Sequence, residues 1–234
     1  MEYSIVIPLK DEEQNIEPLI EEIREAMLKL DAPWEIIAIN DGSTDDTKPI
    51  LDRLANDDIN LRPIHFTENF GQSSAFDAGF KAAKGKWIVT IDGDGQNDPK
   101  DIEKLIKHAN DADLVCGLRQ KREDSLVKRW ISKLGNSVRT FFLKDGIADT
   151  GCSLKLYKKE ALKHIKMYDG LHRFLPALFL IEGFRIKTVH VNHRPRLRGK
   201  TKYTLWNRSL NTIYDLLTVS WMKKRHLKYK IEDQ

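Results

Sequence analysis

The chain has 234 residues with a formal net charge of +4, and 41% of its residues are hydrophobic. This length suits one sizeable α/β domain. The small positive charge falls short of a nucleic-acid-binding signature, so we expect no nucleic-acid partner. A mildly basic chain of this kind suits anionic substrates or a membrane surface instead.

The cysteines and the start of the chain indicate its compartment. Cys116 and Cys152 lack C-x-x-C spacing, which supports neither a zinc site nor a disulfide framework, so we predict two buried thiols. No basic, apolar leader opens the sequence, and no run of about 18 apolar residues occurs. We therefore expect no signal peptide, no transmembrane helix and a reducing, cytoplasmic setting.

Strand and helix patterns alternate through the first half of the chain. Short apolar runs predict strands, and apolar residues spaced three or four apart predict helices. In chain order we expect a strand at 3–9, a helix at 14–30, a strand at 35–40, a helix reaching 54, a strand at 61–66, a helix at 73–84, a strand at 87–91 and a helix capped at 98. This alternation predicts an α/β fold with a mostly parallel central sheet flanked by helices, and with ligands at the carboxyl ends of the strands.

The second half is more basic. We expect a strand at 113–117, a basic helical segment at 125–143, a strand at 154–157, a helix at 159–165, an apolar segment at 174–181, a strand at 186–191, a basic loop at 194–203 and a C-terminal amphipathic helix that begins near 205. That helix carries two tryptophans and precedes a basic cluster at 223–230. Two interpretations remain open, because it can pack on the core or lie in a membrane interface.

Two carboxylates follow the apolar run at 87–91. Asp92 and Asp94 are separated by one residue, so in an extended segment they point to the same face, and Gln96 can add a third oxygen ligand. Such a set suits a hard divalent cation that clamps phosphates. The alternative is a plain polar turn, because aspartate and glycine are preferred turn residues.

Several motifs together resemble known glycosyltransferases. Four motifs lie in the first half: Val6-Ile-Pro8-x-x-x-Glu12-x-x-Asn15, Asn40-Asp41-Gly42-Ser43-Thr44-Asp45, Asn69-x-Gly71 and Asp92-x-Asp94-x-Gln96-x-x-Pro99. Together they resemble the nucleotide-sugar-binding half of the GT-A fold of family 2 glycosyltransferases. Those in the second half are similar to the dolichyl-phosphate mannose synthase and polyprenyl-phosphate glycosyltransferase branch, and they are Gly117-x-Arg119, Asp149-Thr-Gly151-Cys152 and Arg196-x-x-Gly199-x-Thr201-Lys202-Tyr203. Gly93 stands where alanine is common, and Thr201 where serine is usual.

The resemblance implies a GT-A (Rossmann-like) domain over residues 1–203, with a nucleotide-sugar-binding half at 1–112 and an acceptor half at 113–203, followed by a membrane-interfacial helix and basic tail at 204–234. It implies an inverting transfer of a hexose-type sugar from a UDP- or GDP-linked donor to a polyprenyl (dolichyl or undecaprenyl) phosphate, with Mg²⁺ or Mn²⁺ as cofactor. The enzyme would sit peripherally at the cytoplasmic face of a membrane. Many relatives append transmembrane helices at this end, so the interfacial helix or a separate membrane-protein partner would substitute for them.

Two other interpretations of function remain. An enzyme of the same fold could transfer the sugar to a cell-envelope glycan or another lipid. A non-catalytic membrane-recruitment module could also be built on this fold, although the intact acidic and basic motifs argue against it.

The resemblance also assigns residues to the donor and the metal. The metal ligands are Asp92, Asp94 and Gln96, and Arg196 and Lys202 complete the catalytic set by stabilising the leaving diphosphate. The donor-binding residues are Pro8, Glu12, Asp41, Asn69, Gly71 and Asp92. The alternatives are an exposed acid for Glu12, a plain turn for Asn69 and Gly71, and a basic surface loop on anionic lipid for 194–202. Asp45 is expected to be a helix cap.

Cations are expected to collect the acceptor phosphate, whose ionised oxygen needs no general base. The candidates are Arg119, Lys128 and Arg129, with Ser132 as a further donor and Asp149 as the group that orients this side. A solvated basic helix face is the alternative for Lys128 and Arg129.

Overall fold

The computed structural model describes residues 1–119, 139–140, 142–143, 146–147, 149–195, 205–227 and 229, without the side chains of 205–211. Most of the helical segment expected at 125–143 lies outside these residues. So do five of the predicted site residues, namely Lys128, Arg129, Ser132, Arg196 and Lys202.

The described elements follow the predicted alternation. They are β1 (Tyr3–Leu9), α1 (Ile16–Met27), β2 (Trp34–Asn40), α2 (Thr47–Asp57), β3 (Leu61–His65), α3 (Gln72–Ala82), β4 (Trp87–Thr90), η1 (Pro99–Asp101), α4 (Ile102–Ile106), β5 (Leu114–Arg119), β6 (Lys155–Lys158), α6 (Lys159–Leu162), η2 (Leu171–Phe174), α7 (Leu175–Ile181), β7 (Ile186–Val191) and α8 (Leu205–Arg225). Asp98 caps η1 by accepting a hydrogen bond from the backbone N–H of Lys100, as predicted for the residue before Pro99.

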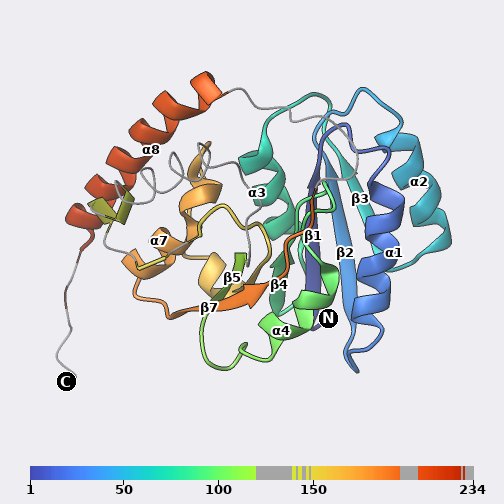
Figure 1. Ribbon diagram of the computed structural model, residues 1–234, viewed down its shortest axis with the longest axis horizontal. Helices are drawn as coiled ribbons and strands as arrows, with labels where there is room; N and C mark the ends of the chain where they lie inside the picture. The colour runs from blue at the N-terminus through green and yellow to red at the C-terminus, as the bar shows by residue number, and fades with distance from the viewer. Residues whose placement is uncertain are drawn as a thin grey trace.

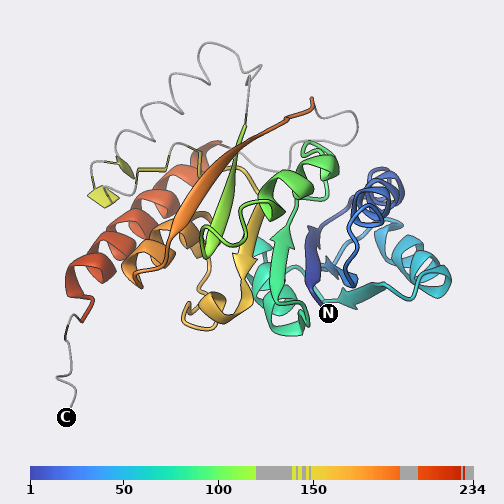
Figure 2. The ribbon, with the colours of Figure 1, turned by 90° about the horizontal axis from the view of Figure 1, so that it is seen from below.

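The strands form a seven-stranded sheet in the order β3-β2-β1-β4-β6-β5-β7 (Figures 1 and 2). The strands β3, β2, β1 and β4 run parallel to one another. β6 runs antiparallel to both β4 and β5, and β7 is parallel to β5. The predicted α/β fold with a mostly parallel sheet is therefore confirmed.

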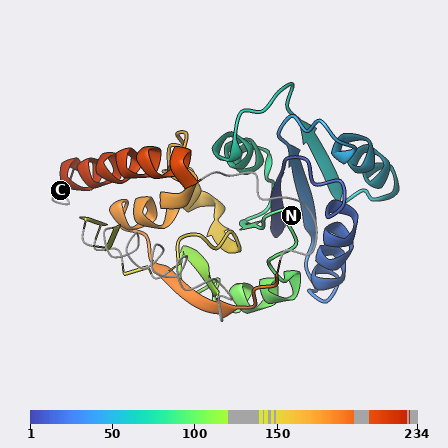
Figure 3. The same cartoon turned by 45° about the horizontal axis from the view of Figure 1, so that its top comes forward.

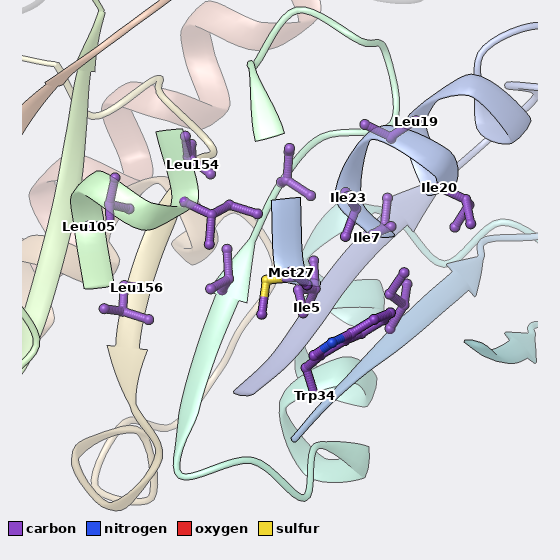
Figure 4. Packing of buried hydrophobic residues seen from close by; sticks show 14 of the residues in the cluster. Ile5, Ile7, Leu19, Ile20, Ile23, Met27, Trp34, Leu105, Leu154 and Leu156 are labelled. Atoms are coloured by element: carbon purple, nitrogen blue, oxygen red, sulfur yellow. The ribbon is translucent and has the colours of Figure 1, made fainter. Parts of the chain in front are cut away.

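Helices cover both faces of the sheet because alternate residues of the buried strands point to opposite sides. On β1, Ile5 and Ile7 pack in one apolar cluster with residues of α1, α2 and α4, whereas Val6 packs in a second cluster with residues of α3, α6 and α7. Figure 4 shows Ile5 and Ile7 beneath Leu19 and Ile23 of α1. The apolar residues of α1 recur at helical spacing, which is why this segment forms an amphipathic helix.

The C-terminal helix α8 lies beside α7, at the opposite end of the molecule from α2 (Figures 1 and 3). Leu216 and Val219 of α8 are buried in a third apolar cluster with residues of η2 and α7. The described part of the chain contains no helix long and apolar enough to cross a membrane.

Gly42 allows the loop after β2 to pass close to the loop after β3. Its φ is +62°, and a Cβ at this position would lie 2.3 Å from the backbone carbonyl carbon of Glu68. We expect Gly42→Ala to lower the free energy of unfolding by roughly 2–5 kcal/mol, because the left-handed conformation and the backbone clash both cost energy. Urea unfolding measures this loss.

Gly183→Ala is the matched control. Gly183 also has a positive φ, +84°, but a Cβ added there would meet no atom within 4 Å, so only the conformational cost of roughly 1–2 kcal/mol applies. Equal losses in the two variants would contradict the proposed close approach at Gly42.

Candidate active site

Hydrogen bonds join the loops that follow β1 and β2 into one wall. The backbone N–H of Asp11 donates to Ser43 Oγ over 2.9 Å, and that of Glu12 donates to Thr47 Oγ1 over 2.9 Å. In return, the N–H of Thr44 donates to Asp11 Oδ1 over 2.7 Å. These loops lie at the carboxyl ends of parallel strands, which is where such sheets bind ligands.

Asp45 bonds the start of α2 from one residue before the N-cap position, which is Asp46 and not Asp45 as predicted. Its carboxylate accepts hydrogen bonds from the backbone N–H of Thr47, the first residue of α2, and from that of Glu13, over 3.0 and 3.2 Å. It therefore belongs to the same wall and holds the start of α2 against the loop after β1.

Asp41 holds the loop that precedes α3. Its buried carboxylate accepts hydrogen bonds from the backbone N–H groups of Phe70 and Gly71, over 2.7 and 3.0 Å. Asn69 Oδ1 also accepts from the N–H of Gly71, over 3.0 Å. A carboxylate offers about four acceptor positions, so Asp41 can still accept bonds from a nucleoside, and this role stays a prediction.

Pro8 and Glu12 lie next to the acidic turn at 92–94. A Cβ on Gly93 would lie 3.4 Å from Pro8 O and 3.6 Å from Glu12 Cγ, and only 2.3 Å from Cδ2 of Leu9. The close approach of Leu9 explains glycine at a position where alanine is common in the resembling branch. The structure thus brings these two predicted donor residues together with the predicted metal ligands.

Asp92 follows β4 and is held on two sides. Gln72 Nε2 donates to Asp92 Oδ1 over 2.9 Å, and the backbone N–H of Asp92 donates to Ser153 Oγ over 3.1 Å. Burial, and to a lesser extent the negative charge of Asp94, raise the pKa of Asp92 to about 6. A hydrogen bond from Ser153 and the charges of Lys155 and Arg119 oppose that rise in pKa.

The two carboxylates fit a divalent cation. They are close enough for Asp94 to disfavour ionisation of Asp92, and a cation between them would relieve both this repulsion and the lost solvation. Among the described residues, no group of three or more His, Cys, Asp or Glu side chains is placed to hold a metal. Mg²⁺ and Mn²⁺ sites of phosphate-transfer type often use one or two carboxylates and complete their coordination with substrate phosphates.

Gln96 lies beside these acids. Its backbone N–H donates to Asp94 Oδ1 over 3.2 Å, and its Nε2 donates to the backbone carbonyl of Arg194 over 3.5 Å. Its role as a metal ligand stays a prediction.

Arg119 and Asp149, both predicted to lie on the acceptor side, form a two-pronged ion pair. Arg119 Nε and Nη2 donate to Asp149 Oδ2 and Oδ1 over 2.7 and 2.8 Å. Both side chains are largely buried, at 15% and 8% exposure. The pair fixes the Arg119 guanidinium at the end of β5, where its charge reaches Asp92 and lowers the pKa of that carboxyl.

The chain that leads into the basic loop is fixed beside the acidic turn. Arg194 forms ion pairs with Glu22 and Asp98 over 2.6 and 2.8 Å, and its backbone N–H donates to Gln96 O over 2.8 Å. Asn97 and His193 form an isolated β-bridge. Arg196 and Lys202 lie outside the described residues, so their contact with the leaving diphosphate stays a prediction.

Three residues of the site were missed from the sequence. Gln72 and Ser153 contact Asp92, and Lys155 is buried with its Nζ donating to the backbone carbonyl of Cys152. The sequence offered two signals for these residues, since Gln72 follows Gly71 and Ser153 follows the Asp149-Thr-Gly-Cys motif. Neither signal reveals a contact with Asp92.

Both Cys116 and Cys152 are buried thiols, as expected.

A mostly parallel seven-stranded sheet flanked by helices, with two carboxylates in the turn after β4, is the arrangement of a GT-A-like fold. Residues 4–166 match the family model described as glycosyl transferase family 2. The chain belongs to this family and to its polyprenyl-phosphate glycosyltransferase branch.

Two curated relatives illustrate the branch. Dodecaprenyl-phosphate galacturonate synthase of Rhizobium johnstonii is 36% identical over 230 residues, which cover 96% of this chain and 68% of the relative. Undecaprenyl-phosphate 4-deoxy-4-formamido-L-arabinose transferase of Pectobacterium atrosepticum is 34% identical over 219 residues, which cover 92% of this chain and 66% of the relative. The chain thus spans about two thirds of the length of these relatives.

Solved structures share the fold. Glucosyl-3-phosphoglycerate synthase from Mycobacterium tuberculosis, in complex with Mn²⁺, UDP and glucosyl-3-phosphoglycerate, superposes with a TM-score of 0.74 at 20% identity, covering 94% of this chain and 80% of that one. TarS from S. aureus in complex with UDP gives a TM-score of 0.62 at 15% identity, with 98% and 67% covered. At these identities the likeness establishes the fold alone.

The raised pKa of Asp92 predicts a stability difference that depends on pH. Between pH 3.8 and about 6 the folded state holds this proton more tightly than the unfolded state, so metal-free wild type loses stability as the pH rises through this window. An Asp92→Asn variant avoids that loss. We expect it to be more stable than wild type by up to about 3 kcal/mol above pH 7, and by little below about pH 4.

Urea unfolding in EDTA across this pH range measures the difference. Asp77→Asn is the control, because Asp77 forms an exposed i,i+4 pair with Lys81 over 2.6 Å, worth about 0.5 kcal/mol. A stability gap between wild type and Asp92→Asn that does not change with pH would show that Asp92 is not destabilised by its charge.

Proposed function

We propose that this protein transfers a sugar from a nucleoside-diphosphate sugar to a polyprenyl phosphate, with inversion and with a divalent cation. The observation that carries the proposal is the pair of carboxylates after β4, in which the buried Asp92 lies next to Asp94, beside Glu12 of the loop after β1 and within electrostatic reach of the Arg119 guanidinium. The names of the two relatives specify a galacturonate and a formamido-arabinose, so the proposal widens the expected hexose-type sugar to include uronates and modified pentoses.

The residues divide the work between donor and acceptor. A divalent cation on Asp92 and Asp94 would neutralise the charge that grows on the departing diphosphate. The wall formed by the loops after β1 and β2 binds the nucleoside, with Asp41 keeping the loop at 69–71 in place. Arg119, fixed by Asp149, attracts the acceptor phosphate to the other side of the sugar.

The reaction then needs no proton transfer from the acceptor. An ionised phosphate oxygen attacks the anomeric carbon, forming the new C–O bond as the bond to the β-phosphate oxygen breaks and its electron pair leaves with the diphosphate. Attack on the face opposite the leaving group inverts the anomeric centre. The side chains orient the two phosphates and stabilise charge, which is the usual role of a preorganised site in such transfers.

The outer face of α8 supports contact with a membrane surface. Ile213, Leu217 and Trp221 recur at helical spacing and are 54%, 50% and 63% exposed. Three exposed basic residues, Lys223 to Arg225, end the helix. An exposed apolar stripe followed by cations matches a helix that lies at the boundary of anionic lipid headgroups.

An Asp94→Ala variant tests the proposed reaction. Wild-type protein mixed with a nucleotide sugar, Mn²⁺ and undecaprenyl phosphate is expected to release nucleoside diphosphate. The variant should release at least about 100-fold less, because a charge-stabilising interaction worth about 3 kcal/mol is lost from the transition state. A prior thermal-shift screen of UDP-, GDP- and sugar-linked nucleotides, with and without metal, selects the donor.

Two controls accompany this assay. EDTA should stop the wild-type reaction, and a soluble sugar acceptor should not replace undecaprenyl phosphate. Turnover by Asp94→Ala at the wild-type rate would exclude the metal assignment. Equal turnover with the soluble acceptor would favour the alternative class of acceptor.

A Leu217→Glu, Trp221→Glu double variant tests membrane contact. We expect wild type to sediment with vesicles that contain anionic phospholipid and the variant to bind them at least about tenfold more weakly, because two apolar anchors are replaced by charges. Ile59→Glu is the control, since Ile59 is fully exposed in the loop between α2 and β3 at the other end of the molecule. Unchanged vesicle binding by the double variant would exclude α8 as the contact surface.

A further inference from the structure

Ser153 is joined to the acidic turn and its neighbours by three hydrogen bonds. Its Oγ accepts hydrogen bonds from the backbone N–H of Asp92 over 3.1 Å and from Asn97 Nδ2 over 2.8 Å. Its backbone carbonyl accepts a hydrogen bond from Thr90 Oγ1 over 2.5 Å. One residue thus binds the end of β4, the first acid of the turn and the segment beyond it.

These contacts use both acceptor positions of the Ser153 hydroxyl. A serine oxygen can accept two hydrogen bonds and donate one. Asp92 N–H and Asn97 Nδ2 take both acceptor positions, so the Ser153 oxygen holds the backbone from which the Asp92 carboxylate projects. Asn97 is itself buried, and its Oδ1 accepts from Cys152 Sγ over 3.7 Å, which limits rotation of its amide.

Gln72 supplies a neutral donor to the Asp92 carboxylate itself. Its Nε2 donates to Asp92 Oδ1 over 2.9 Å from the first residue of α3, a different element from the turn that carries Ser153. Neither Gln72 nor Ser153 neutralises the charge of Asp92. Ser153 holds the backbone N–H and Gln72 holds Oδ1, so together they fix the orientation of the carboxylate and leave its negative charge available to a cation.

We propose that Ser153 is a positioning residue that orients the Asp92 carboxylate for the divalent cation of the donor site, with Gln72 as the second support. This inference rests on the proposed function, because it assumes that Asp92 binds the cation that clamps the donor diphosphate. Groups that hydrogen-bond to a metal ligand fix its orientation, and their loss usually weakens metal binding by about 10–100-fold.

Mn²⁺ binding provides a direct test without turnover. The free Mn²⁺ signal in electron paramagnetic resonance is titrated with metal-free protein, with and without the nucleoside diphosphate selected by thermal shift. We expect Ser153→Ala to bind Mn²⁺ about 10–100-fold more weakly than wild type, and Ser153→Thr, which keeps the hydroxyl, to bind within about threefold of wild type. Ser153→Cys, a near-isosteric change to a weak acceptor, should bind weakly as well and replaces the alanine variant if that variant fails to fold.

Ser4→Ala is the matched control. Ser4 is a buried serine at the amino end of β1 whose Oγ donates to Glu35 Oε1 and accepts from the N–H of Gly85, both over 2.7 Å. Its removal costs a comparable set of hydrogen bonds far from the acidic turn, so we expect lower stability with unchanged Mn²⁺ affinity.

The outcomes separate the two proposals. If wild type binds Mn²⁺ and the alanine or cysteine variant binds it equally well, Ser153 is not a positioning residue, and the proposed function stands. Failure of threonine to restore binding also overturns the inference, because the hydroxyl would then not be the active feature. If wild type binds no Mn²⁺ even with nucleoside diphosphate, the metal-dependent function itself is wrong.

Discussion

The site depends on the charge of Asp92, which is held where water is scarce and next to a second carboxylate. Ionised Asp92 is disfavoured both by burial and by Asp94, and among the described residues neutral hydrogen bonds and the charges of Lys155 and Arg119 compensate in part. The turn that carries Asp92 can sustain this cost because Ile88 and Val89 of the preceding β4 are fully buried between β1 and β6. The stability given up here would favour the proposed cation, a trade-off expected at functional sites.

The reversed direction of β6 explains why the residues predicted for donor and acceptor meet. In a purely parallel sheet the residues before a strand lie at the edge opposite to the ligand site. Because β6 is antiparallel to β4 and β5, the residues that precede it, including Asp149 and Ser153, lie at the edge where β4 and β5 end. Arg119 at the end of β5 and Asp92 after β4 are therefore joined through this one segment.

The sequence predicts most elements but not this convergence. The pattern of apolar residues places the strands 3–9 and 186–191 correctly, because the first is a buried apolar run and the second alternates apolar residues with the exposed Thr188 and His190. The carboxylate spacing identifies the acidic turn. Periodicity carries no strand direction, so the antiparallel β6 and the contact of Ser153 with Asp92 could not be anticipated. Likewise, Asp41 was expected to face a nucleoside, whereas its two N–H partners at 70 and 71 come from a distant loop whose path depends on tertiary packing.

The same reasoning applies to α8, where two interpretations of one amphipathic pattern turn out to be compatible. Successive helix residues are about 100° apart, so residues 213, 217 and 221 share one face while 216 and 219 share another. Leu216 and Val219 pack on η2 and α7, and Arg173 of η2 donates to Thr212 Oγ1 over 3.1 Å. η2 also reaches α3, because His172 Nδ1 lies 2.6 Å from Ser73 Oγ, next to Gln72. Core packing therefore fixes α8 to the elements that hold Asp92, and it does so with the face that leaves the apolar stripe exposed.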